Sequence, residues 1–313
     1  MKRYVINTIG VILMVVAIAF LIKRVIDLGI NASLFASPHI VLIIMGLSLI
    51  HILSLLLLAY AWRLILSCFV ESPVNTVKAT IVYLKSNIAK YLPGNVGQYV
   101  GRQIFGIALG MSQMQIAFSS VFEIGLLLIG VIIIALVFGG SRIIRAFNTF
   151  RIYGGSVIIV MASTLLLLAV LLFFFVKKKP NTFMWIKAFI KNKYNWTQMI
   201  IVLLLYITQF SILGIVFILL IKIKMQLSIS EISVFLAASA ISWIIGFIAP
   251  GVPGGIGIRE STLLLTLSIY PQDIILFAAI IQRMIIILGD ILAWAVCVLF
   301  LERSWKKRDN ESS

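Results

Sequence analysis

Long apolar runs constrain this chain more than any other feature of its sequence. Six segments of about 20 residues carry few charges, at 4–22, 40–62, 115–138, 155–176, 197–221 and 274–301. A helix of that length crosses the hydrocarbon core of a bilayer. Hydrophobic residues make up 62% of the 313 residues and charged residues only 12%, which leaves too little polar surface for a soluble protein. We therefore predict an all-α integral membrane protein with six full transmembrane helices.

Two further apolar stretches, 76–110 and 231–270, are each broken near the middle by glycine and proline. The breaks read Pro93-Gly94-Asn95-Val96-Gly97 and Pro250-Gly251-Val252-Pro253-Gly254-Gly255. Proline removes a backbone donor and glycine weakens a helix, so a continuous span through either break is disfavoured. Non-helical backbone at membrane depth is tolerated only against protein or a water-filled cavity. We predict two re-entrant helical hairpins, and two complete helix pairs that cross the bilayer are the alternative.

The two breaks share a longer pattern, P-G-x-x-G-x-x-x-x-R, which ends at Arg102 and at Arg259, 157 residues apart. The same offset lays 40–62 over 197–221 and 115–138 over 274–301. Each half then has an odd number of crossings, so the second half is inverted relative to the first. We predict a single membrane domain of two inverted-topology repeats, 1–154 and 155–301, followed by a cytoplasmic tail at 302–313. This architecture is typical of many secondary transporters.

The basic residues predict the orientation of the chain. The net charge is +16, and with the N-terminus inside, 17 of the 26 Lys and Arg residues face the cytoplasm and eight face outside. Both termini are therefore expected to be cytoplasmic in a multi-pass protein of the cell membrane. Lys23 and Arg24 follow the first apolar run where a signal peptide would have small residues, which favours a retained span. The same cations attract anionic lipids, and nucleic acid is not an expected partner.

The second helix of each hairpin is expected to begin near Gln98 and near Ile256. The first N–H groups of such helices lack intrahelical partners and carry a partial positive charge, which suits a phosphate or a carboxylate. The guanidinium groups of the two motif arginines would add donors, although both could instead extend to the interface as topology anchors. Glu260 could cap its helix or bind a cationic headgroup. The candidate substrate-binding residues are Gly94, Gly97, Arg102, Gly251, Gly254, Gly255, Arg259 and Glu260.

Three ionisable residues lie inside predicted spans: Glu123, Arg283 and Asp290. Ionisable groups at membrane depth are costly and mark functional sites by default. Arg283 and Asp290 are two helical turns apart on one face, so each needs another partner. We predict an intramembrane charge network here, which could serve transport or simply hold the helices together.

The remaining polar positions predict less. Tyr83, Asn87 and Lys90 belong to a polar face along 76–92 that could line a cavity or rest among lipid headgroups. His39, His51, Cys68 and Cys297 are isolated, so neither a metal site nor a disulfide is expected. No phosphate-binding loop of an ATPase is present, and neither a cofactor nor a catalytic residue is predicted.

Both breaks resemble motifs of a known family. Tyr91-Leu92-Pro93-Gly94, with Gly97 and Arg102, and the Pro250-to-Glu260 segment are similar to the transmembrane region of lysylphosphatidylglycerol synthases, a flippase-like domain. The resemblance covers essentially the whole chain and implies a protein that translocates lipid or handles glycolipid. Two-part members of that family carry a soluble C-terminal catalytic domain, whereas only 301–313 follow the last span here. We therefore expect a stand-alone member without synthase activity.

Together these observations predict a lipid flippase or transporter for an anionic phospholipid or lipid-linked headgroup. Membrane lipids are the expected partners, and an ion gradient is the expected energy source if transport is active. The alternative is a membrane component, enzyme or scaffold, of a cell-surface glycolipid or polyprenyl-lipid pathway. Such a component would work beside a separate synthase or glycosyltransferase.

Overall fold

The computed structural model describes residues 38–70, 73–91, 96–139, 192–249 and 253–302, and every regular element within these ranges is a helix. Five of the helices are long and apolar enough to cross a membrane, which makes the chain an all-helical, multi-pass membrane protein. They are α2 (Pro38–Ser67), the helix Gln113–Gly139, α7 (Lys193–Lys222), α8 (Ile229–Ile248) and Gln272–Leu301. The last combines α10 (Gln272–Val296) with a π-helical turn, η5 (Cys297–Leu301).

Four of these helices coincide with predicted spans, since α2, Gln113–Gly139, α7 and α10 with η5 cover 40–62, 115–138, 197–221 and 274–301. The predicted spans 4–22 and 155–176 lie outside the described residues. The fifth long helix, α8, belongs to the stretch that was predicted as a hairpin.

Shorter helices occupy the two broken stretches. The first stretch contains α3 (Thr76–Asn87) with the 3-10 turn η2 (Ile88–Tyr91), then α4 (Gly97–Phe105) with the 3-10 turn η3 (Gly106–Leu109). The second contains α8, the 3-10 turn η4 (Pro253–Gly255) and α9 (Ile258–Thr266). We call them the first helix pair and the second helix pair. At nine residues, α4 and α9 are each about 14 Å long, or roughly half of a bilayer core.

Local side chains explain where several of these helices begin. The Asn75 side chain accepts a hydrogen bond from the Lys78 backbone N–H at 3.0 Å and starts α3. Ser228 and Glu231 form a capping box at the start of α8, and the Ser228 N–H donates to Glu231 Oε2 at 2.8 Å. These contacts satisfy N–H groups that have no partner within the helix.

The packing is that of a protein in an apolar solvent. A continuous buried core joins α2, α7, α8, α10 and Gln113–Gly139, and a smaller one around Trp62 joins α2 to α3. Large apolar side chains also cover the outside: Leu42 is 72% exposed and Leu136 68% exposed. In water such surfaces would aggregate, whereas they are compatible with lipid tails.

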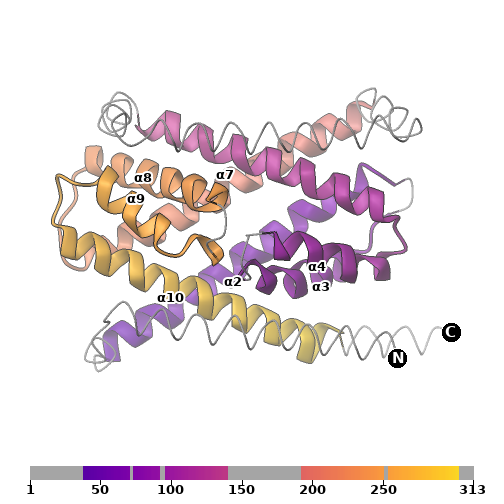
Figure 1. The fold of residues 1–313 in the computed structure, drawn as a ribbon, viewed down its shortest axis with the longest axis horizontal. Coiled ribbons are helices and arrows are strands. Elements are labelled where there is room, and N and C mark those ends of the chain that lie inside the picture. Colours follow the sequence, from indigo (N-terminus) through magenta and orange to yellow (C-terminus); the bar gives the residue numbers. More distant parts are fainter. Residues whose placement is uncertain (1–37, 71–72, 92–95, 140–191, 250–252, 303–313) are drawn as a thin grey trace.

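The two helix pairs point toward each other from opposite ends of the bundle, and their turns meet at its centre (Figure 1). Ile88 and Tyr91 of η2 share a buried apolar cluster with Ile256, next to η4. The backbone of Gly254 lies against the Tyr91 ring, since a Cβ there would be 3.4 Å from the ring. Residues distant in sequence therefore come together where the two turns touch.

Candidate functional site

A cavity of about 110 Å³ lies where the turns of the two helix pairs meet, and we call it the central cavity. Residues of α2, α7, α10, Gln113–Gly139 and both helix pairs line it. Its basic lining residues are Lys90, Arg102, Arg259 and Arg283, whereas Glu123 is the acidic one among the described residues. The cavity therefore combines apolar walls with a group of charged side chains that are mostly basic.

Arg102 forms a fully buried ion pair with Glu123, and each side chain is 1% exposed. Both Nη atoms of Arg102 donate to the carboxylate, Nη2 to Oε1 at 3.0 Å and Nη1 to Oε2. The guanidinium carbon lies 4.3 Å from the centre of the Tyr83 ring and 5.0 Å from that of the Trp62 ring. The charge of Arg102 is therefore neutralised by Glu123, and aromatic faces stabilise it further.

A close contact between α3 and α4 helps to position Arg102. A Cβ at Gly101 would lie 3.0 Å from the Cβ of Ser86, so only glycine fits without displacing a neighbour. The short approach places the residue after it, Arg102, beside Tyr83 of α3.

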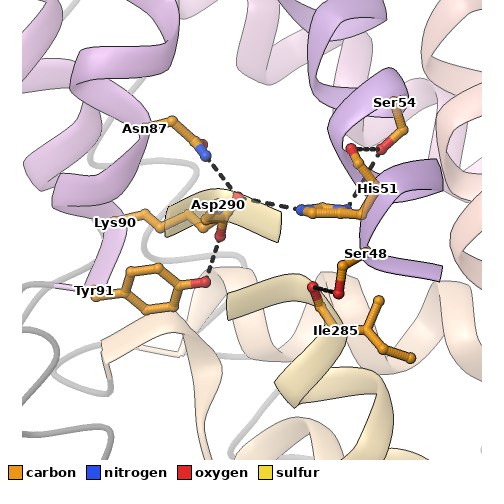
Figure 2. Close-up of polar contacts among 8 residues, drawn as sticks. All are labelled: Ser48, His51, Ser54, Asn87, Lys90, Tyr91, Ile285 and Asp290. Atoms are coloured by element: carbon orange, nitrogen blue, oxygen red, sulfur yellow. Dashed lines mark hydrogen bonds and ion pairs between the residues drawn. The ribbon is translucent and has the colours of Figure 1, made fainter. Parts of the chain in front are cut away.

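A second polar cluster surrounds Asp290 of α10, which is 2% exposed (Figure 2). Its carboxylate accepts hydrogen bonds from Asn87 Nδ2 at 2.9 Å and from the Tyr91 hydroxyl, and Lys90 Nζ lies 2.7 Å away. His51 of α2 contributes Nε2 at 3.2 Å. One carboxylate on α10 thus connects the end of α3 and the turn η2 to α2.

Arg283 and Glu260 hold the turn of the second helix pair. Arg283 Nε donates to Glu260 Oε1 at 2.6 Å, and its Nη atoms donate to the carbonyls of Gly254 at 2.9 Å and Gly255 at 3.0 Å. The other carboxylate oxygen of Glu260 accepts from the Gly257 N–H at 2.6 Å. Glu260 therefore caps α9, one of its two predicted roles.

Arg259 differs from the other three basic residues of the cavity. Within the part of the chain that the structure describes, no carboxylate lies within ion-pair distance of Arg259, and its buried Nε has no hydrogen-bond partner. Its guanidinium carbon lies 5.5 Å from the Trp243 ring centre. A Cβ at Gly246 would overlap the Arg259 side chain, so glycine gives it room to reach the cavity.

The structure brings most of the predicted site residues to one place but pairs them differently. Arg102 and Arg259 line the same cavity, Gly254, Gly255 and Glu260 shape the second turn, and Gly97 begins α4. Gly94 and Gly251 lie outside the described residues. Glu123, Arg283 and Asp290 were predicted as one charge network, whereas each belongs to a separate cluster with its own partner.

Sequence reasoning missed the group around Asp290. Tyr91 was noted only as part of a motif, and His51 was treated as isolated. The available signal was the polar face along 76–92, because Tyr83, Asn87 and Lys90 all line the cavity. No group of three His, Cys, Asp or Glu side chains suited to a metal forms among the described residues.

Comparison of the chain with protein-family models, curated proteins and solved structures finds no match. The case for a function therefore depends on the geometry of the central cavity.

Proposed function

We propose that the protein is a flippase or transporter that moves a lipid with an anionic headgroup across the cell membrane. The main support for this proposal is that Arg259 has no acidic partner among the described residues. A cation buried in a low-dielectric site is costly unless it is paired, and the other three basic residues of the cavity have carboxylate partners. A phosphate that entered the cavity would supply the partner that Arg259 lacks among the described residues.

The arrangement of the helix pairs supports two re-entrant hairpins in inverted repeats. At nine residues, α4 and α9 are too short to cross a bilayer, whereas α8 of the second pair, at 20 residues, is long enough to do so. The pairs approach the centre from opposite ends (Figure 1), as they would if one entered from the cytoplasm and the other from outside. In this proposal the repeats are 1–154 and 155–301 and both termini are cytoplasmic.

The size of the cavity indicates how transport would proceed. A volume of about 110 Å³ is well below the 300–1,000 Å³ typical of sites that enclose a whole small molecule. Only a headgroup would enter, while the acyl chains stay in lipid. The helix pairs would have to separate from one side at a time, so that the headgroup reaches Arg259 from one leaflet and leaves to the other.

The function can be tested by headgroup translocation in proteoliposomes that contain a fluorescent anionic phospholipid. Wild-type protein should speed translocation over protein-free vesicles, and Arg259→Ala should lower the rate about tenfold or more. Lys222→Ala is the matched control, because it removes a positive charge from an exposed position at the end of α7. Equal rates for wild type, Arg259→Ala and protein-free vesicles would refute the proposal.

The topology can be tested with single cysteines at Val96, Ser112 and Ile269. Ser112 should react with an impermeant maleimide from the cytoplasmic side and Ile269 from outside, whereas Val96, at the start of α4, should resist a bulky reagent from outside. Reaction of Val96 from outside would instead indicate that the first helix pair crosses fully. Burial raises the pKa of the Cys68 thiol to about 11, and replacing both native cysteines by serine removes any residual background.

A further inference from the structure

A second polar group at the central cavity lacks a partner. Gln209 of α7 lines the cavity with only 3% of its surface exposed, and its Oε1 has no hydrogen-bond partner in the structure. The next residue, Phe210, packs edge-on against Trp243 at 4.7 Å between ring centres, and Trp243 in turn contacts Arg259. Gln209 and Arg259 therefore line the same cavity, and the packed rings of Phe210 and Trp243 connect the helices that carry them.

The two unpartnered groups require opposite kinds of ligand atom. Arg259 can only donate, so it needs an anionic or carbonyl acceptor. The carbonyl oxygen of Gln209 can only accept, so it needs an O–H or N–H donor. A ligand that satisfies both must carry an anion and a hydrogen-bond donor close together.

The charge of the cavity selects between the two kinds of donor. Lys90, Arg102 and Arg283 are paired with Asp290, Glu123 and Glu260, so Arg259 leaves one uncompensated positive charge at the cavity within the described ranges. A phosphate neutralises that charge, whereas an ammonium group on the same headgroup would restore it. Like charges at short range in a site with little water are strongly disfavoured. A neutral hydroxyl group donates to Gln209 without that cost.

We infer that the cavity takes a phosphodiester lipid whose headgroup carries free hydroxyl groups, that is, a polyol or sugar phosphate, and that Gln209 recognises a hydroxyl while Arg259 binds the phosphate. This inference rests on the proposed function, since it assumes that the lipid headgroup occupies the cavity. It adds a specificity-determining residue on α7, outside both helix pairs.

Two lipids of equal charge test the inference directly. Phosphatidylglycerol carries two headgroup hydroxyls, whereas phosphatidylmethanol is the same phosphodiester with none. Wild-type protein should translocate phosphatidylglycerol about tenfold faster, because phosphatidylmethanol leaves Gln209 without its donor. Equal wild-type rates for the two lipids would overturn the inference and leave the flippase proposal intact.

Variants of α7 assign the selectivity to Gln209. Gln209→Leu, or Gln209→Met as a second variant of similar size, should bring the ratio of the two rates close to one. Gln198→Leu is the matched control, because Gln198 also has a buried, unpartnered Oε1 on α7 but does not line the central cavity. It should keep the wild-type ratio, and an unchanged ratio in both Gln209 variants would contradict the assigned role.

A soluble probe tests whether the ligand of the cavity is the headgroup of a lipid or a free phosphate compound. Uptake of radiolabelled glycerol 3-phosphate into the same vesicles should be at the protein-free level. Suppose that wild-type protein takes up glycerol 3-phosphate, that Gln209→Leu lowers this uptake, and that neither lipid is translocated. This result would refute the flippase proposal and would support recognition of a hydroxyl-bearing phosphate. Absence of any transport or binding with all three probes would overturn both.

Discussion

The two copies of the P-G-x-x-G-x-x-x-x-R pattern end in arginines that have different surroundings. Arg102 is 1% exposed, makes two hydrogen bonds to Glu123 and is enclosed by aromatic rings. Arg259 lines the same cavity, but no acidic partner is found for it in the described part of the chain. The motif thus brings an arginine to the centre of the protein in each half, but it does not determine what the arginine binds.

The helix that follows each motif accounts for the difference. The residue 157 positions after Glu123 is Ile280, so α10 offers no carboxylate where the first half has one. In the second half the acid lies next to the arginine, at Glu260, where the first half has Gln103. That acid pairs with Arg283 and caps α9 instead. Arg102 is therefore bound by an acid within the protein, whereas Arg259 has no acidic partner among the described residues.

Breaking the Arg102–Glu123 pair should have the largest effect on stability. Glu123→Gln leaves the buried Arg102 charge without a counter-ion, so we expect the free energy of unfolding to fall by about 3–5 kcal/mol. The measurement is denaturant unfolding in detergent micelles. The double variant Arg102→Met/Glu123→Leu should recover most of the loss, because it removes both charges. A Glu123→Gln protein as stable as wild type would contradict a structural role for this pair.

Asp290→Asn should have the next largest effect. The amide keeps one acceptor oxygen, so it can retain the hydrogen bond from Asn87 or the one from Tyr91 but not both, and the ion pair with Lys90 is lost. We expect a loss of about 2–3 kcal/mol in the free energy of unfolding, measured in the same assay. Adding Lys90→Met should restore stability, and an additive loss in the double variant would show that the two side chains do not interact.

Sequence reasoning located the central features of the molecule because they depend on local properties. Proline and glycine close together in the sequence disfavour a continuous helix, so the breaks before α4 and before α9 follow from the residues themselves. The cost of charge in lipid likewise marks Glu123, Arg283 and Asp290 as residues that require partners.

The identity of those partners could not be predicted, because it depends on packing between distant segments. His51 and Asp290 are 239 positions apart, and they meet only because α2 packs against α10. Lys90 was placed on a polar face along 76–92, but its partner, Asp290, lies 200 positions further along the chain. A single sequence without covariation carries no signal for such pairs.

Supplying the missing acid should make the second half resemble the first. Ile286 lines the central cavity together with Arg259, so Ile286→Glu introduces a carboxylate near the guanidinium. We expect lipid translocation to fall about tenfold, because the new carboxylate competes with the headgroup phosphate. Ile286→Gln controls for size and polarity and should retain most of the rate. Comparable losses in the two variants would show that charge is not what inhibits transport.

The smallest effect concerns Gly255 and Gly257, whose counterparts 157 positions earlier are Gln98 and Val100. Gly257 has φ of 86° and a Cβ there would meet nothing within 4 Å, so Gly257→Ala should cost only the backbone strain, about 1 kcal/mol in the free energy of unfolding. At Gly255, φ is 69° and a Cβ would lie 2.7 Å from the carbonyl oxygen of Gly246. Gly255→Ala should therefore lower the free energy of unfolding more than Gly257→Ala does. It should also slow translocation, because the added methyl group would displace Gly246, and Gly246 makes room for the Arg259 side chain. Equal stabilities of the two variants would mean that the close approach of η4 to α8 contributes little to the site.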